Sequence, residues 1–385
     1  MFVKKKLLLW LFFILAINLS VLAQEQPQPV AGFINLRHSF KSEIMGEERT
    51  LLVHVPANYT QSDEKYPVVY MLDAGATQMA MMVGLLEQQA NAGEVPPMIL
   101  VGITNTNRNF DLTPTPMTFP KERGNGEKFM QFVEKEVVPM IEKGYRTQPF
   151  RIFAGHSFGG LMAVYSFVSR PDLFNAYIAS SPALHWDNRI VIRQAEDLFK
   201  QKREWKKTMF MAIANEPGFL DDANAFRDLL KKYNPKGFDY EFREYKDETH
   251  GSSSLIHYYT GLRMIFKGWL APETESFGEL QKHYEELSKR FGYKVLVPEN
   301  QFAQAAAKYA QTNQFDEAVE VLKKDLESYP NSPGAYNSLG IIYERIGNKK
   351  LARESYEKAY KLAEAQKNEQ LAKDAKANFD RILGK

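Results

Sequence analysis

The chain has 385 residues, enough for one large domain and a smaller one. Its 44% hydrophobic and 25% charged residues are typical of globular proteins and exclude a disordered or collagen-like chain. The formal net charge of +2 argues against nucleic acid as a partner, and the absence of cysteine excludes disulfides, thiol catalysis and thiolate metal sites.

The first 23 residues have the pattern of a signal peptide. Three lysines at positions 4–6 precede an apolar run over 7–22, and Ala23 supplies a small residue at the expected cleavage position. We therefore expect an exported protein, periplasmic or secreted, in a bacterial envelope. An uncleaved membrane anchor is the alternative, because the run is close to the shortest length that spans a bilayer.

Residues 24–272 are predicted to form an α/β domain. The segment from about 33 to 56 alternates like a strand, and short apolar runs typical of strands buried on both faces follow at 66–72, 98–103, 151–154, 176–181, 208–214 and 239–245. Helical patterns lie between them at 77–92, 126–145, 161–169 and 222–233. This alternation predicts an open, mostly parallel sheet covered by helices.

A candidate nucleophile lies at the end of one predicted strand. Residues 155–159 read Gly-His-Ser-Phe-Gly, which satisfies the G-x-S-x-G pattern, and a helix is predicted directly afterwards. A sharp strand-to-helix turn of this kind raises the serine hydroxyl above the sheet edge. Ser157 is therefore the predicted nucleophile of an α/β-hydrolase fold.

The general base should be a histidine late in the domain, because the triad order in this fold is Ser, acid, His. Among seven histidines, His250 follows the last predicted strand, whereas His257 is expected on the next helix and His185 is a further rival. The acid should follow the strand at 208–214. Glu216 comes first there, with Asp221 and Asp222 as alternatives.

After residue 272 the sequence becomes rich in helix-forming residues and has few apolar runs. A charged helical linker is expected over 273–298, and 299–385 should hold two copies of a tetratricopeptide-like repeat with a capping helix. Several aromatic and alanine positions of the first copy recur 34 residues later, which is the period of this repeat. Such a tail predicts a possible protein partner. Tyr336, Leu339, Gly340, Tyr343, Gly347, Ala352, Tyr356 and Ala359 occupy the signature spacings in the second copy.

Over roughly 55–270 the chain resembles the putative-esterase family of α/β hydrolases, which includes siderophore esterases, feruloyl esterases and mycolyltransferases. The resemblance rests on residues 66–73, on Arg108 with 111–114, and on 155–161, 181–186 and 250–252. It implies the catalytic roles of Ser157 and His250, with Glu216 as the acid. It also implies an oxyanion hole formed by the N–H of Phe158 and a second N–H, from Gly75 or Ala74. The usual Asp-Gly of that turn is Asp73-Ala74-Gly75 here.

The expected function is hydrolysis of a small-molecule carboxylic ester through an acyl-enzyme, with no cofactor and no metal. Arg108, His185 and Trp186 are candidates for lining the substrate pocket. Acyl transfer to an alcohol shares the same acyl-enzyme and stays open as an alternative. The other alternative is a catalytically idle hydrolase-fold protein whose tail binds a partner.

Overall fold

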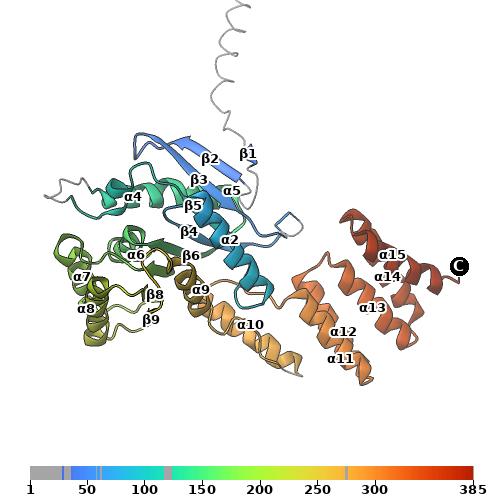
Figure 1. Cartoon of the computed structure of the whole chain (residues 1–385). Helices are drawn as coiled ribbons and strands as arrows, with labels where there is room; N and C mark the ends of the chain where they lie inside the picture. The colour runs from blue at the N-terminus through green and yellow to red at the C-terminus, as the bar shows by residue number, and fades with distance from the viewer. Residues whose placement is uncertain are drawn as a thin grey trace, which may run out of the picture. The chain divides into compact units, whose positions relative to one another are not determined.

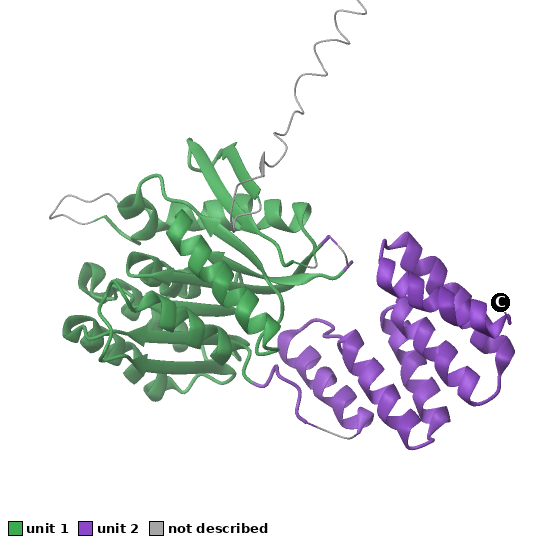
Figure 2. Cartoon of the chain, turned by 45° about the vertical axis from the view of Figure 1, so that its right-hand side comes forward, with its two compact units in different colours: residues 1–59, 64–267 green, residues 60–63, 268–385 purple. Residues whose placement is uncertain are grey.

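The computed structural model describes residues 28–29, 36–57, 59–60, 63–116, 124–273 and 276–384. The predicted signal peptide at 1–23 lies outside these residues. The chain divides into two compact units (Figure 2): unit 1 comprises Met1–Tyr59 and Glu64–Lys267, and unit 2 comprises Thr60–Asp63 and Gly268–Lys385. The domain boundary expected at residue 272 lies shortly after the end of unit 1. No helix among the described residues is long and apolar enough to cross a membrane.

Unit 1 is built on a sheet of nine described strands in the order β1-β2-β3-β5-β4-β6-β7-β8-β9 (Figure 1). Strands β5, β4, β6, β7, β8 and β9 pair in parallel, whereas β1, β2, β3 and β5 pair antiparallel. The predicted mostly parallel sheet is therefore confirmed. The strands are β1 (Gln28–Pro29), β2 (Leu36–Lys41), β3 (Glu48–His54), β4 (Tyr66–Met71), β5 (Ile99–Ile103), β6 (Thr147–His156), β7 (Ala176–Ser180), β8 (Lys207–Ile213) and β9 (Phe238–Glu244).

Helices cover both faces of this sheet. Helices α2 (Ala76–Asn91) and α9 (Ser254–Ile265) pack against each other, with α2 on β5 and α9 on β7 and β8. Helix α6 (Phe158–Ser169) packs on β6 and β7, and α3, α4 and α7 in turn contact α6. The remaining helices of unit 1 are α3 (Arg108–Leu112), α4 (Gly126–Phe132), α5 (Val138–Gly144), α7 (Trp186–Phe199) and α8 (Pro217–Tyr233).

Two helices differ from their predicted form. The segment predicted as one helix over 126–145 contains a π-helical turn, η1 (Val133–Val137), between α4 and α5. Helix α8 begins at Pro217 rather than at residue 222, because proline is favoured in the first turn, where its missing N–H leaves no hydrogen bond unmade.

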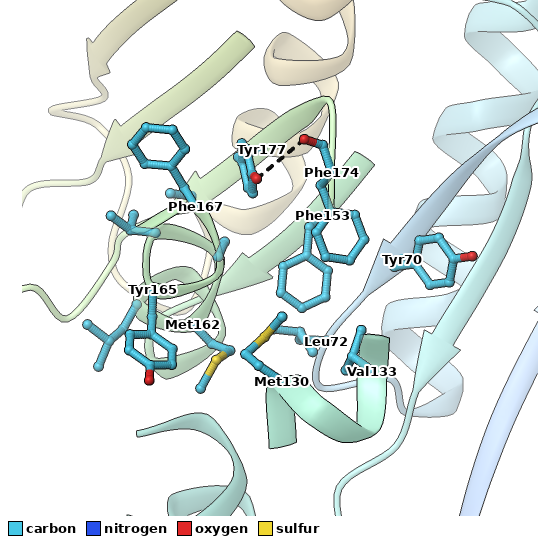
Figure 3. Packing of buried hydrophobic residues seen from close by; sticks show 14 of the residues in the cluster. Tyr70, Leu72, Met130, Val133, Phe153, Met162, Tyr165, Phe167, Phe174 and Tyr177 are labelled. Atoms are coloured by element: carbon cyan, nitrogen blue, oxygen red, sulfur yellow. Dashed lines mark hydrogen bonds between the residues drawn. The ribbon is translucent and has the colours of Figure 1, made fainter. Parts of the chain in front are cut away.

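The core beneath β6, the strand that ends just before Ser157, is aromatic. Phe153 of β6 stacks on Phe174 with ring centroids 4.4 Å apart, and Tyr70 of β4 meets Phe174 edge-on (Figure 3). The Tyr177 hydroxyl donates a hydrogen bond to the Phe174 carbonyl. All of these side chains are fully buried. Close packing of these buried aromatic side chains thus supports β6.

Unit 2 is helical, with α10 (Phe277–Phe291), α11 (Glu299–Gln311), α12 (Phe315–Ser328), α13 (Pro333–Arg345), α14 (Lys349–Ala365) and α15 (Glu369–Ile382). Helix α10 occupies the expected linker. Helices α13 and α14 pack closely at Gly340, where the ring of Tyr356 lies against the glycine backbone. A Cβ at this position would be only 2.5 Å from that ring. Arg381 of α15 pairs with Glu344 of α13, which ties the last helix to the preceding pair.

Candidate active site

Ser157 stands at the turn between β6 and α6 with φ 60° and ψ −115°, a backbone conformation rare for a residue with a side chain. Its N–H donates to the Ser180 carbonyl at 2.9 Å. Two glycines allow the chain to turn so tightly. A Cβ on Gly155 would lie 2.3 Å from the backbone of Gly159, and one on Gly160 would lie 2.7 Å from the Ser180 carbonyl oxygen.

His250 and Glu216 are brought together from two loops at the carboxyl end of the sheet. Nδ1 of His250 is in hydrogen-bond contact with Oε1 of Glu216. The other carboxylate oxygen of Glu216 accepts from Ser181 Oγ at 2.6 Å and from the Ala214 N–H at 3.2 Å. These bonds orient the carboxylate toward the imidazole, and the Glu216 side chain is only 10% exposed.

The two alternative acids lie elsewhere. Asp221 is exposed on α8. Asp222 is buried and accepts a hydrogen bond from Arg189 Nε at 2.7 Å, with His185 Nδ1 3.6 Å away. Of the three carboxylates that the sequence left open, the structure therefore brings only Glu216 to His250.

His250 lies beside the turn that bears Ser157. Its ring centroid is 4.5 Å from that of His156, the residue directly before Ser157. Among the described residues no hydrogen bond joins Ser157 Oγ to His250. Catalytic hydrogen bonds of this kind are often long or poorly aligned until a substrate binds.

His257, a rival for the role of base, is fully buried on α9. Its Nδ1 lies 2.8 Å from Ser180 Oγ, which also lies 2.9 Å from Nδ1 of His156. Burial, together with the neighbouring histidines, lowers the pKa of His257 to about 3. Burial and nearby His250 lower the pKa of His156 to about 4. Both rings are therefore neutral at neutral pH.

The N–H groups suggested for the oxyanion hole differ in their surroundings. Phe158 is the first residue of α6, and Gly75 precedes the first residue of α2, so each N–H belongs to the start of a helix. The Ala74 N–H donates to the Ile103 carbonyl at 3.2 Å and is thereby engaged at the sheet edge. Within the part of the chain that the structure describes, the Gly75 N–H makes no backbone hydrogen bond of this kind, so Gly75 is the better candidate of the two residues.

The three pocket candidates take different positions. The His185 side chain is 53% exposed and packs edge-on against Phe219, which in turn contacts the His250 ring. Trp186 is 6% exposed, and its Nε1 donates to the Thr115 carbonyl. Arg108 donates two hydrogen bonds to Asp73.

An unusual turn follows Trp186. Asp187, Asn188 and Arg189 all have left-handed backbone conformations, with φ of 46°, 50° and 63°. The turn is held at both ends, because Asp187 accepts from Thr115 Oγ1 at 2.7 Å and Arg189 donates to the buried Asp222. Left-handed conformations cost about 1 kcal/mol or more per residue and often mark functional regions.

Sequence reasoning gave no role to Ser181 or Asp73. Ser181 belongs to the stretch 181–186 that carries the family resemblance, and its place directly after a parallel strand is the signal that indicates a position at the edge of the site. The described part of the chain contains no group of three or more His, Asp or Glu side chains placed to hold a metal ion.

The fold and the strand–serine–helix turn are those of an α/β hydrolase. The family described as "Putative esterase" matches residues 42–217, and a tetratricopeptide repeat matches residues 333–366. The chain is also similar to an IroE-like serine hydrolase from Shewanella oneidensis, whose crystal structure is 33% identical, with a TM-score of 0.66 over 76% of this chain and 99% of that one. The chain therefore belongs to the putative-esterase family and is a carboxylic ester hydrolase.

Two further similarities extend this result. Ferri-bacillibactin esterase BesA of Bacillus subtilis is 26% identical over 213 residues, which are 48% of this chain and 73% of that protein. A protein from Capnocytophaga ochracea shares the fold over 91% of this chain and 99% of its own, with a TM-score of 0.61 and 18% identity. The resemblance noted in the sequence is thus confirmed, both for the esterase domain and for the repeat.

Proposed function

We propose that unit 1 hydrolyses its ester through a covalent acyl-enzyme, with Ser157 as nucleophile, His250 as general base and Glu216 as the acid that orients it. The observation that carries this proposal is the contact of Glu216 Oε1 with His250 Nδ1 beside the turn that bears Ser157. A carboxylate in this position holds the imidazole in one tautomer and stabilises the imidazolium.

The reaction proceeds in two halves. Ser157 Oγ attacks the ester carbonyl carbon while His250 Nε2 takes the hydroxyl proton, and the carbonyl oxygen becomes an oxyanion held by the N–H groups of Phe158 and Gly75. Collapse of this intermediate breaks the bond to the alcohol, which leaves with the proton from His250. Water, deprotonated by His250, then attacks the acyl-enzyme; the bond from the acyl carbon to Ser157 Oγ breaks, His250 returns the proton to Oγ, and the carboxylic acid is released.

The substrate is proposed to be a small-molecule ester of the siderophore kind. This choice is supported by the names of similar proteins, which include a ferri-bacillibactin esterase and an apo-salmochelin esterase of Escherichia coli. We further propose that the protein is exported, because the sequence starts with lysines followed by an apolar run. The tetratricopeptide repeat is proposed to contact a protein partner.

A fluorophosphonate probe followed by peptide mass spectrometry tests the nucleophile. The wild type should be labelled at Ser157, and Ser157→Ala should lose labelling together with aryl-ester turnover, by on the order of a million-fold in kcat. Ser39→Ala on β2 serves as a matched control that keeps both properties. Labelling at another residue, or near-normal hydrolysis by Ser157→Ala, would overturn the proposal. Products formed with added alcohols distinguish hydrolysis from acyl transfer.

A further inference from the structure

One guanidinium connects the two segments proposed to form the oxyanion hole. Arg108 Nε and Nη2 donate to Asp73 Oδ1 and Oδ2 at 2.7 and 2.9 Å, so the pair is bidentate. The same guanidinium lies over the ring of Phe158, with Cζ 5.2 Å from the centroid. Arg108 thus contacts both the residue that begins the turn 73–75 and the residue that follows Ser157.

Asp73 is a partly buried carboxylate, with its side chain 20% exposed, and its backbone conformation is uncommon for a residue with a side chain. It has a left-handed φ of 57° directly after β4, and it also accepts from Asn105 Nδ2 at 2.5 Å. Its Oδ2 lies 3.1 Å from the point that a Cβ on Gly159 would occupy, which puts the carboxylate against the first turn of α6. An unpaired negative charge here would oppose the negative charge that develops on the ester oxygen.

The helix that carries Arg108 is itself anchored. Helix α3 has only five residues and cannot hold its position alone. Asp111 on this helix accepts two hydrogen bonds from Arg49 of β3, at 2.6 and 2.8 Å, and both side chains are buried. A buried bidentate pair fixes position and orientation together. The Arg108 guanidinium is therefore presented from a fixed base.

We infer that Arg108 is a positioning residue of the oxyanion hole: it fixes the turn 73–75 against Phe158 and neutralises the carboxylate of Asp73. This inference rests on the proposed function and changes the role first expected for Arg108, which was to line the substrate pocket. Its contribution appears after substrate binding, because negative charge develops on the ester oxygen only as Ser157 attacks. Loss of the guanidinium should therefore lower kcat and leave KM nearly unchanged.

The test is a double-mutant cycle of Arg108→Met, Asp73→Asn and the double variant, measured as kcat and KM for an aryl ester. Arg108→Met should lose about 100-fold in kcat, comparable to removing one oxyanion donor, with KM within about threefold. The double variant should regain about tenfold over Arg108→Met, because the unpaired charge is then absent. The affinity of an aryl boronic acid, which forms a tetrahedral serine adduct, should fall in parallel with kcat/KM.

Two further variants complete the design. Arg203→Met is the matched control, since Arg203 also makes a bidentate pair, with Asp172, and lies 4.2 Å from the ring of Trp205; it should keep wild-type kinetics. Arg108→Lys retains the positive charge but not the two parallel N–H donors of the guanidinium, and it should lose about tenfold in kcat. This variant also tests the inference if Arg108→Met does not fold. A raised KM with normal kcat, or a double variant no better than Arg108→Met, overturns the inference. Activity surviving Ser157→Ala would instead overturn the proposed function.

Discussion

His250 Nδ1 and Glu216 Oε1 are in contact although 34 positions separate the two residues in the chain. An ionised carboxylate can only accept hydrogen bonds, so Nδ1 of the neutral imidazole carries the hydrogen and Nε2 keeps its lone pair. The contact with Glu216 therefore determines which nitrogen of His250 can accept a proton.

Replacing the two candidate bases should give opposite results. His250→Ala should lose nearly as much turnover as Ser157→Ala, because nucleophile and base act as a unit. His257→Asn should keep kcat/KM within about tenfold, since an amide can still bond Ser180 and the ring takes no part in proton transfer. Steady-state kinetics with an aryl ester measure both. The reverse ranking would transfer the role of base to His257.

Glu216→Gln should lower kcat by up to about 10⁴-fold, because the amide no longer holds the imidazole in the required tautomer. Asp221→Asn is the matched control on the same segment. Its side chain is exposed, and we expect wild-type rates. A silent Glu216→Gln with a severely impaired Asp221→Asn would show that the acid is misassigned.

The free energy of unfolding of unit 1 should decrease as the pH falls from about 6.5 toward 4. Burial holds the folded-state pKa of His257 at about 3 and that of His156 at about 4, below the value of about 6.5 in an unfolded chain. In this window the unfolded chain binds more protons, so acid favours unfolding. His257→Asn should reduce the slope by up to about 1.4 kcal/mol per pH unit. Identical slopes in urea titrations of both proteins would contradict this prediction.

Because of Asp325 on α12, we expect the free energy of unfolding of unit 2 to have the opposite pH dependence. Asp325 is 1% exposed, and among the described residues neither of its carboxylate oxygens has a hydrogen-bond partner. Burial and, less strongly, Glu299 raise its pKa to about 7. The folded chain therefore keeps a proton that the unfolded chain loses above about pH 4, and stability is lost as the pH rises toward 7. Asp325→Asn should raise the Tm of unit 2 more at about pH 8 than at about pH 4. An equal change at both values would contradict the assignment.

A chain ending at Pro272 should keep Ser157-dependent turnover of a small aryl ester, with kcat/KM within about threefold of the full chain. Every residue assigned to the site lies upstream of that point, and unit 1 ends at Lys267. The melting temperature of the truncated protein provides the second measurement. An aggregated or inactive product would mean that the repeats belong to the folding unit of the enzyme.

The elements that were predictable are those with a strong local pattern. The apolar runs at β4 to β8 and the Gly-flanked Ser157 define the sheet and its turn from neighbouring residues alone. The acid was not fixed in this way, because Glu216, Asp221 and Asp222 lie in one short stretch and only tertiary packing separates them. Arg108 and Asp73 are 35 positions apart, and no local sequence pattern links them, so their ion pair could not be predicted. The sequence pattern does not predict helices α3 and α7, because α3 is only about one turn long and α7 includes the left-handed residues 187–189.

The left-handed turn at 187–189 limits how this enzyme can be redesigned. Asparagine and aspartate tolerate such a conformation far better than β-branched residues do, and glycine adopts it freely. A substitution library aimed at the surface around His185 should therefore recover small polar residues or glycine at Asp187 and Asn188, whatever ester is used for selection. New specificity is better sought at Phe219, whose ring contacts His250 and whose backbone lies in the first turn of α8.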